Sequence, residues 1–215
     1  SKRQSNREEI FTRILEAAEV EFGLKGYSGA SLQHIADRAN LPKPNIVYYF
    51  QSKSNLYKQV LNQILMDWND LFDQATVDDD PAVVLDSFIR EKLELSFTNP
   101  RSSRIFAMEV IGGATHIGDY LKEDLVPWLS SRVEVIQGWI DAGKMRAVDP
   151  TSLIFMIWAT TQHYADFEAQ ILALTNKEAF VEADLQRIGD TVSSIILTGV
   201  GLVVPTNAEN SSTAC

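Results

Sequence analysis

Residues 31–57, SLQHIADRANLPKPNIVYYFQSKSNLY, constrain the fold more than any other part of the chain. Apolar residues recur at helical spacing over residues 32–39, and the preceding Ser31 has a hydroxyl that caps a helix. The Asn-Leu-Pro sequence at 40–42 then interrupts the pattern, because asparagine tolerates the left-handed conformation and proline cannot continue a helix. A second helix is expected to begin near Lys43. The segment therefore predicts two short helices joined by a tight turn.

Two such helices have two interpretations. They are either core helices of an ordinary all-α domain or a DNA-binding helix-turn-helix, whose second helix enters the major groove. The exposed positions favour the second interpretation, because they combine groups that bind phosphates, base edges and aromatic faces within one or two turns. The predicted DNA-binding residues are Ser31, Gln33, Lys43, Pro44, Asn45, Tyr48, Tyr49 and Lys53.

A longer pattern surrounds this motif. The stretches FGLKGY, SLQHIADRAN and YYFQSKSNLY follow one another, and together they resemble the N-terminal domain of TetR-family transcriptional regulators. The resemblance implies that Lys53 holds a DNA phosphate at the start of a long linker helix. Asn40, Pro42 and Pro44 stand where Gly, Ser and Gly are common in the family, which leaves the operator sequence open.

The net charge of −10 is unusual for a DNA-binding protein until it is divided along the chain. Residues 1–60 hold nine Lys and Arg against six Asp and Glu, net +3, whereas residues 61–215 hold ten against twenty-three, net −13. A basic head on an acidic body meets DNA through one end only.

The strong periodic signals are all helical, so we expect an all-α fold of about nine helices. The predicted domains are a three-helix DNA-binding domain at 1–53 and a ligand-binding and dimerisation domain at 54–204, followed by a disordered tail at 205–215. The fourth helix is expected to reach about residue 74. One helix is expected over about 118–142 with a bend at Pro127, and the last two are expected to end near 174 and 198.

Several classes of protein are disfavoured. The one cysteine is Cys215, no apolar run reaches membrane-spanning length and no signal peptide opens the sequence, so a cytoplasmic protein without membrane contact is expected. The three histidines lack metal-ligand spacing, which favours surface or hydrogen-bonded roles. No phosphate-binding loop or nucleophile motif is present, so neither a cofactor nor an enzymatic activity is expected.

The stretch IWATTQHYADFEAQ is the second informative feature. Trp158, Gln162, Ala165 and Asp166 share one helical face by their spacing of four, seven and eight residues. An amide and a carboxylate beside an indole need polar partners, since unpaired polar groups are costly to bury. Those partners are either other side chains or the dimer mate, or else a small planar ligand whose hydrogen-bonding edge matches the amide and whose ring stacks on Trp158.

Lys92 and Ser96 lie one turn apart in IREKLELSF. Lys92 is either an ordinary surface lysine or a donor to a ligand carbonyl oxygen. With the latter interpretation, the predicted ligand-binding residues are Trp68, Lys92, Ser96, Trp158, Gln162, Tyr164 and Asp166.

REKLELS, SRIFAMEV and LIFMIWATTQHYADF resemble the branch of the TetR family that contains pyrimidine-utilisation repressors. The resemblance implies a pocket for uracil, thymine or a related nitrogenous metabolite, whose binding lowers DNA affinity. Two alternatives stay open within the family, namely an apolar or drug-like ligand and a purine. A remote alternative is a small-molecule enzyme that uses Asp166, His163 and Lys92 as acid–base groups.

The last two predicted helices are broadly apolar, as in LIFMIWATT and VSSIILTGVGLVV. They are either core helices or the surface of a homodimer. A helix-turn-helix of this size needs two half-sites for useful affinity, so a homodimer on a palindromic double-stranded DNA operator is expected. The family resemblance implies that these two helices of each subunit form the dimer contact.

Overall fold

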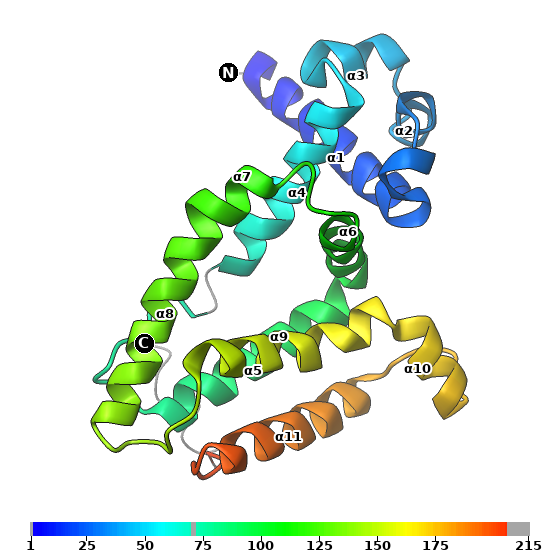
Figure 1. Ribbon diagram of the computed structural model, residues 1–215. Coiled ribbons are helices and arrows are strands. Elements are labelled where there is room, and N and C mark those ends of the chain that lie inside the picture. Colours follow the sequence, from blue (N-terminus) through cyan, green and yellow to red (C-terminus); the bar gives the residue numbers. More distant parts are fainter. Residues whose placement is uncertain (1, 70–71, 206–215) are drawn as a thin grey trace. The chain divides into compact units, whose positions relative to one another are not determined.

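A computed structural model describes residues 2–69 and 72–205 of the chain, and no β-strand occurs in these ranges (Figure 1). The predicted all-α fold class is therefore confirmed. The helices are α1 (Lys2–Gly29), α2 (Leu32–Arg38), α3 (Lys43–Phe50), α4 (Lys53–Asn69), α5 (Pro81–Thr98), α6 (Pro100–Ile111), α7 (Gly118–Tyr120), a π-helical turn (Leu121–Leu125), α8 (Val126–Asp141), α9 (Pro150–Asp166), α10 (Glu168–Thr175) and α11 (Glu182–Gly199).

The chain divides into two compact units, and neither is continuous in sequence. The first, here called the head, comprises residues 1–67 and 101–121, and the second, the body, comprises 68–100 and 122–215. These units do not coincide with the predicted domains 1–53 and 54–204, because the first part of α4 buries its apolar face in the head. Tyr57, for example, lies with its ring centroid 4.7 Å from that of Phe22. The predicted disordered tail, 205–215, lies outside the described residues except for Pro205.

Three helix boundaries differ from those expected. The fourth helix ends at Asn69 rather than near residue 74. The helix expected over about 118–142 is helical without a gap from Gly118 to Asp141, but it is divided into α7, the π-helical turn and α8, and Pro127 lies just after the π-helical turn. The helix expected to reach residue 174 is interrupted at Phe167, whose φ of −114° and ψ of 23° separate α9 from α10.

The helix-turn-helix forms as its sequence predicts. The Ser31 hydroxyl accepts a hydrogen bond from the backbone N–H of His34 at 3.1 Å and so caps α2. Asn40 adopts the left-handed conformation with φ 52°. Ile35 and Ala36 of α2 and Ile46 of α3 are buried, so the two helices share one apolar contact and leave their other faces exposed.

In the body, α5 packs against both α9 and α11. Asp80 and Asp149 cap α5 and α9 through hydrogen bonds to the backbone N–H groups of Ala82 and Ser152, each at 2.8 Å, and a proline follows each cap. The core is closed largely by aliphatic and aromatic side chains of these helices and of α8, among them the fully buried Trp139.

One buried carboxylate joins α5 to α11. Asp86 is fully buried and accepts hydrogen bonds from the Ser193 hydroxyl of α11 and from Nε of Arg90 at 2.9 Å. Arg90 also forms an ion pair with Asp190 of α11, with Nη1 3.0 Å from the carboxylate. Since Asp190 is half-exposed, only the Asp86 end of this network is protected from water.

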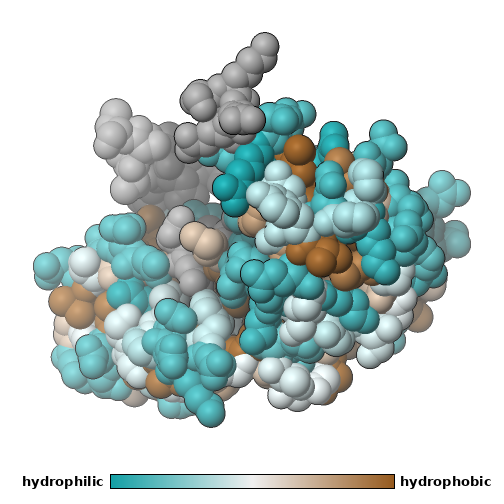
Figure 2. Space-filling view, turned by 90° about the horizontal axis from the view of Figure 1, so that it is seen from above, coloured by the Kyte–Doolittle hydropathy of each residue, from teal (hydrophilic) through white to brown (hydrophobic). Residues whose placement is uncertain are grey.

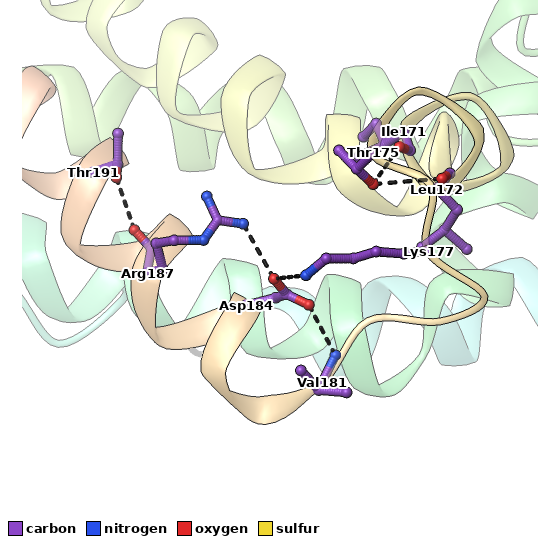
Figure 3. A network of polar contacts seen from close by, with 8 residues as sticks. All are labelled: Ile171, Leu172, Thr175, Lys177, Val181, Asp184, Arg187 and Thr191. Carbon is purple, nitrogen blue, oxygen red and sulfur yellow. Dashed lines mark hydrogen bonds and ion pairs between the residues drawn. The ribbon is translucent and has the colours of Figure 1, made fainter.

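A second carboxylate, that of Asp184, caps the N-terminus of α11 (Figure 3). Asp184 accepts hydrogen bonds from the Lys177 ammonium, from the backbone N–H of Val181 at 3.2 Å and from Arg187 at 3.1 Å. These donors, the Lys177 hydrogen bond first, lower the pKa of Asp184 to about 2. The carboxylate therefore stays charged well into the acid range, and it neutralises free N–H groups at the helix N-terminus.

The segment between α4 and α5 is held by donors from α8 and from the residues after it. Arg132 donates to the carbonyl oxygens of residues 72, 73 and 75 over 2.7–3.2 Å. Lys144 donates to those of residues 77, 78 and 79 over 2.8–3.1 Å, and the Trp139 indole donates to the carbonyl between them, at 3.0 Å. Seven carbonyl groups of one loop are thus bound by three side chains.

No helix within the described ranges is both long enough and apolar enough to cross a membrane. The face of the molecule in Figure 2 is mostly hydrophilic, and its hydrophobic residues gather in small separate patches.

The Asp86 network makes a direct prediction about stability. Asp86→Ala should lower the free energy of unfolding by about 3–5 kcal/mol, because it removes one partner of a buried charge pair. Asp190→Ala, which removes the exposed partner of the same arginine, should cost less than about 1 kcal/mol. Urea unfolding of both variants measures the two free energies of unfolding. Equal losses in the two variants would contradict a larger contribution from the buried Asp86.

Candidate DNA-binding surface and ligand site

Helix α3 carries five of the eight predicted DNA contacts, and three of them, Lys43, Pro44 and Tyr48, are exposed. Ile46 and Phe50 are buried one turn apart, and the Phe50 ring stacks on Phe11 of α1 with 4.9 Å between centroids. This packing turns Lys43 and Tyr48 outward, and Tyr48 is 72% exposed. The outward face of α3 therefore combines a cation with a phenol, as the sequence predicted.

Sequence reasoning missed one residue on this face. Val47 follows the predicted contacts Lys43 and Pro44 by one turn and is 44% exposed, an unusual position for a large aliphatic side chain. Pro44 is exposed too, whereas Asn45 is half-buried. An apolar side chain on a recognition helix suits the methyl group of thymine. Its exposure is a tertiary property that helical spacing alone did not reveal.

The other predicted DNA contacts have partners within the head. The Gln33 side chain donates to the Asp37 carboxylate at 2.8 Å, and Ser31 is engaged as the cap of α2. Lys53 donates to the carbonyl oxygens of Tyr27 at 2.8 Å and Ala30 at 3.0 Å. An ammonium has three donors, so these two bonds commit most of the Lys53 group to the turn before α2. A phosphate contact by Lys53 stays a prediction.

A polar cluster in the head was not predicted. Glu109 of α6 accepts from the backbone N–H of His116 at 2.6 Å and lies 3.2 Å from Nδ1 of its ring. The His116 ring in turn lies 4.3 Å from the Tyr27 ring and 5.0 Å from the Tyr57 ring, between centroids. Burial, the charge of Glu109 and a hydrogen bond to it raise the pKa of Tyr57. The segment after α6 is thereby fastened to α1 and α4.

Two further contacts hold α6 on the head. The Ser102 hydroxyl donates to Glu19 of α1 at 3.1 Å. The side chain of Arg101 fills the space where a Cβ atom on Gly23 would stand, within 2.4 Å of that position. Gly23 is therefore the residue that lets the first turn of α6 lie against α1.

In the body, Lys92 is the most unusual of the predicted ligand residues. Its side chain is 7% exposed, and burial lowers the pKa of its ammonium to about 8. The ammonium lies 4.8 Å from the centroid of the Trp68 ring, and it forms no ion pair with any side chain that the structure describes. The surface alternative for Lys92 is therefore wrong.

The neighbouring Ser96 is also buried, but its hydroxyl donates to the Lys92 carbonyl oxygen at 3.0 Å. Its polar group is thus satisfied within α5.

The predicted residues of α9 occupy different environments. Trp158 is half-buried and stacks on Trp128 of α8, with centroids 5.7 Å apart. Gln162, also half-buried, makes no side-chain hydrogen bond to any residue that the structure describes. Tyr164 lies 6.2 Å from Phe97 of α5, and Asp166 already has a partner within the protein. Among the predicted ligand residues, the polar groups of Lys92, Gln162, Trp158 and Tyr164 make no hydrogen bond to any side chain that the structure describes, and no fully buried side-chain nitrogen or oxygen atom of the described residues lacks a partner.

Within the described ranges, no group of three or more His, Cys, Asp and Glu side chains is placed to hold a metal ion.

Comparison with known proteins decides the family. The pattern of "Bacterial regulatory proteins, tetR family" matches residues 14–60, and that of "YcdC-like protein, C-terminal region" matches residues 61–203. The chain belongs to the TetR family. It is a DNA-binding transcriptional regulator and not an enzyme, so the alternative that uses Asp166, His163 and Lys92 as acid–base groups is wrong.

Individual TetR proteins agree with this assignment. The HTH-type transcriptional regulator RutR of Escherichia coli (strain K12) is 40% identical over 187 residues, which cover 87% of this chain and 88% of RutR. Two solved structures share the fold. AibR in complex with isovaleryl coenzyme A and operator DNA has a TM-score of 0.65 at 20% identity, covering 92% of this chain and 100% of that chain. A TetR-like regulator from Rhodococcus sp. RHA1 has a TM-score of 0.64 at 15% identity, covering 88% and 94%.

The exposure of Tyr48 and Lys43 predicts their effect on DNA binding. Tyr48→Ala or Lys43→Ala should weaken binding to a selected operator by about 1–3 kcal/mol, the worth of one good base contact. Neither should change the melting temperature, because neither side chain is buried. Gel-shift titration and thermal unfolding measure the two effects. Operator affinity that is unchanged in both variants would remove the proposed groove contact.

Proposed function

We propose that this TetR-family regulator is a dimeric repressor that leaves its operator when a pyrimidine base, or a related nitrogenous metabolite, binds in the body. The observation that carries the proposal is a pair of polar groups without a hydrogen bond to any described side chain, the ammonium of the buried residue Lys92 and the amide of the half-buried Gln162. The sequence similarity to RutR over most of the chain supports the same class of regulator.

The chemistry of the two groups selects the ligand. A primary amide offers one donor and one acceptor side by side, and the imide edge of a pyrimidine offers the complementary pair. The Lys92 ammonium donates to a second carbonyl oxygen. Trp158, already stacked on Trp128, provides an aromatic wall for a flat ring. An apolar ligand would leave both Lys92 and Gln162 unpaired, at a cost of about 1–3 kcal/mol for each neutral group and more for the charge.

Dimerisation belongs to the same proposal. Exposed apolar side chains occur on α9 and α11, and Phe155, Met156 and Ile195 are 48%, 54% and 68% exposed. Such residues suit a subunit interface. Two heads are needed to occupy the half-sites of a palindromic operator, about 34–36 Å apart. Sedimentation equilibrium tests this step, and a monomer at micromolar concentration would contradict it.

The route from ligand to head runs through α5 and α6. Asn99 alone separates α5, which carries Lys92, from α6. The loop that follows α6 contains His116, whose ring contacts the rings of Tyr27 and Tyr57 in the head. A ligand shifts DNA affinity only if it binds one arrangement of this segment more tightly than another. We infer that the His116 contacts carry that difference.

Gln162→Leu tests the ligand. Leucine is close to glutamine in size, so the variant should fold and bind DNA as the wild type does. Its affinity for uracil should fall by about 1–3 kcal/mol, because the imide edge would face methyl groups. Calorimetry of both proteins with uracil, thymine and several purines measures the change.

Failure of the wild type to bind any pyrimidine would contradict the pyrimidine assignment, and purine binding would support the alternative ligand. Equal uracil affinity in both proteins would show that uracil does not bind at Gln162 of α9.

The pKa of Lys92 predicts the pH dependence of the same binding. The ammonium is charged below pH 8 and loses its proton above it. A ligand that accepts a hydrogen bond from the charged form raises the pKa of Lys92. Uracil affinity should therefore be constant below about pH 7, fall above pH 8 and be accompanied by proton uptake near pH 8. Lys92→Gln should show neither effect in calorimetry in buffers of different ionisation enthalpy.

His116→Ala tests the route. Two ring contacts of about 0.5–1.5 kcal/mol each are comparable with a typical coupling free energy of about 1–3 kcal/mol. The variant should keep its affinities for the operator and for the base that binds the wild type, while the loss of operator affinity caused by that base shrinks. Thr115→Ala, at the exposed neighbouring position, is the control. A full response in His116→Ala would exclude this route.

A further inference from the structure

A groove in the head extends beyond the predicted DNA-binding residues, of which Tyr49 alone lines it. It has a volume of about 370 Å³ and is here called the α4 groove. It is lined by Phe11, Tyr49, Phe50, Gln51, Asn55, Lys58, Gln59 and Asn62. The last four recur at intervals of three, four and seven residues, so they form one stripe along α4.

The lining of the α4 groove is rich in hydrogen-bond donors. Four primary amides and one ammonium surround an aromatic floor, and no carboxylate lines it, although the chain as a whole has a net charge of −10. Lys58 is exposed and forms no ion pair with any residue of the described ranges. The groove is therefore complementary to an anion with several acceptor oxygens.

The second lysine of α4 is bound elsewhere. The ammonium of Lys53 is committed to the carbonyl oxygens of Tyr27 and Ala30 and to the Tyr27 ring. Lys58 retains all three of its donors. On this basis Lys58, and not Lys53, is the stronger candidate for a direct phosphate contact from α4.

The α4 groove begins where the recognition helix ends. Tyr49 belongs to α3, and Gln51 terminates it with φ 65° and ψ −45°, a conformation that is uncommon for a residue other than glycine. The Ser52 hydroxyl then accepts from the backbone N–H of Asn55 at 3.1 Å. This tight turn places the stripe on α4 directly after the DNA-facing residues of α3.

We propose that the α4 groove binds the sugar–phosphate backbone of duplex DNA beside the base pairs that α3 contacts. Lys58 neutralises one phosphate, and Asn55 and Gln59 donate to oxygens of the same strand. The stripe from Asn55 to Asn62 is about 10 Å long at 1.5 Å per residue, which matches about three steps of one strand at 3.4 Å each. The proposal rests on DNA binding through α3 and extends its footprint.

The salt dependence of DNA binding tests the proposal without any effector. The wild type, Lys58→Ala and the control Lys25→Ala are titrated with a generic duplex between 50 and 200 mM salt. Lys25 is also an exposed lysine of the head but lies outside the groove. Loss of one phosphate contact should make the slope of log K against log salt shallower by about 0.9 for each bound head. Lys58→Arg should restore the wild-type slope.

A second measurement locates the contact. Duplexes that carry a selected operator are shortened by a few base pairs at each end. The wild type should lose affinity as the flanks are removed, whereas Lys58→Ala should lose much less. Asn55→Ala should weaken binding to the long duplex without changing the slope, because an amide neutralises no charge.

The outcomes separate the two levels of the proposal. If the wild type binds the duplex and the slopes of Lys58→Ala and Lys25→Ala are both unchanged, the α4 groove is not a phosphate site, while DNA binding through α3 stands. If Lys25→Ala flattens the slope as much as Lys58→Ala does, the effect is one of general charge and the groove is again excluded. Wild-type protein that binds no duplex would overturn both levels.

Discussion

Helix α5 has to bury polar side chains against two other helices, and the organisation of the body depends on how each is satisfied. Asp86 is paired with Ser193 of α11 and with Arg90, and Ser96 bonds to its own helix. Lys92 has an aromatic face but no counter-charge. Lys92 is thus the buried polar side chain of α5 for which the described residues supply the fewest partners.

The head depends on a different kind of contact. Its elements come from two distant parts of the sequence, and the His116 ring joins them through its contacts with the rings of Tyr27 and Tyr57. Lys53 binds the start of α4 to the turn before α2. None of these contacts requires DNA, and they leave Lys43 and Tyr48 of α3 exposed.

The elements that depend on local signals could be predicted from the sequence. Ser31 and Asn40 act through their own backbone, so their spacing was enough to place α2. The two Asp-Pro pairs that begin α5 and α9 are local signals of the same kind. The docking of α6 on α1 could not be predicted, because it depends on packing between segments far apart in sequence. Gly23 illustrates the difference, since its role is visible only when Arg101 lies over it.

The predicted site residues divide in the same way. The sequence left Lys92 open between a surface lysine and a ligand donor, and only its burial in the folded chain shows that it is not a surface residue. The partners of Lys53 lie more than twenty residues earlier in the sequence, beyond any local pattern.

The loop between α4 and α5 has a further consequence. Arg132 and Lys144 donate hydrogen bonds to its carbonyl groups. A carbonyl group has no net charge, so salt weakens these contacts less than it weakens contacts between two charged groups. High ionic strength should dissociate the head from DNA without unfolding this part of the body, so elution by salt would yield folded protein that is free of DNA.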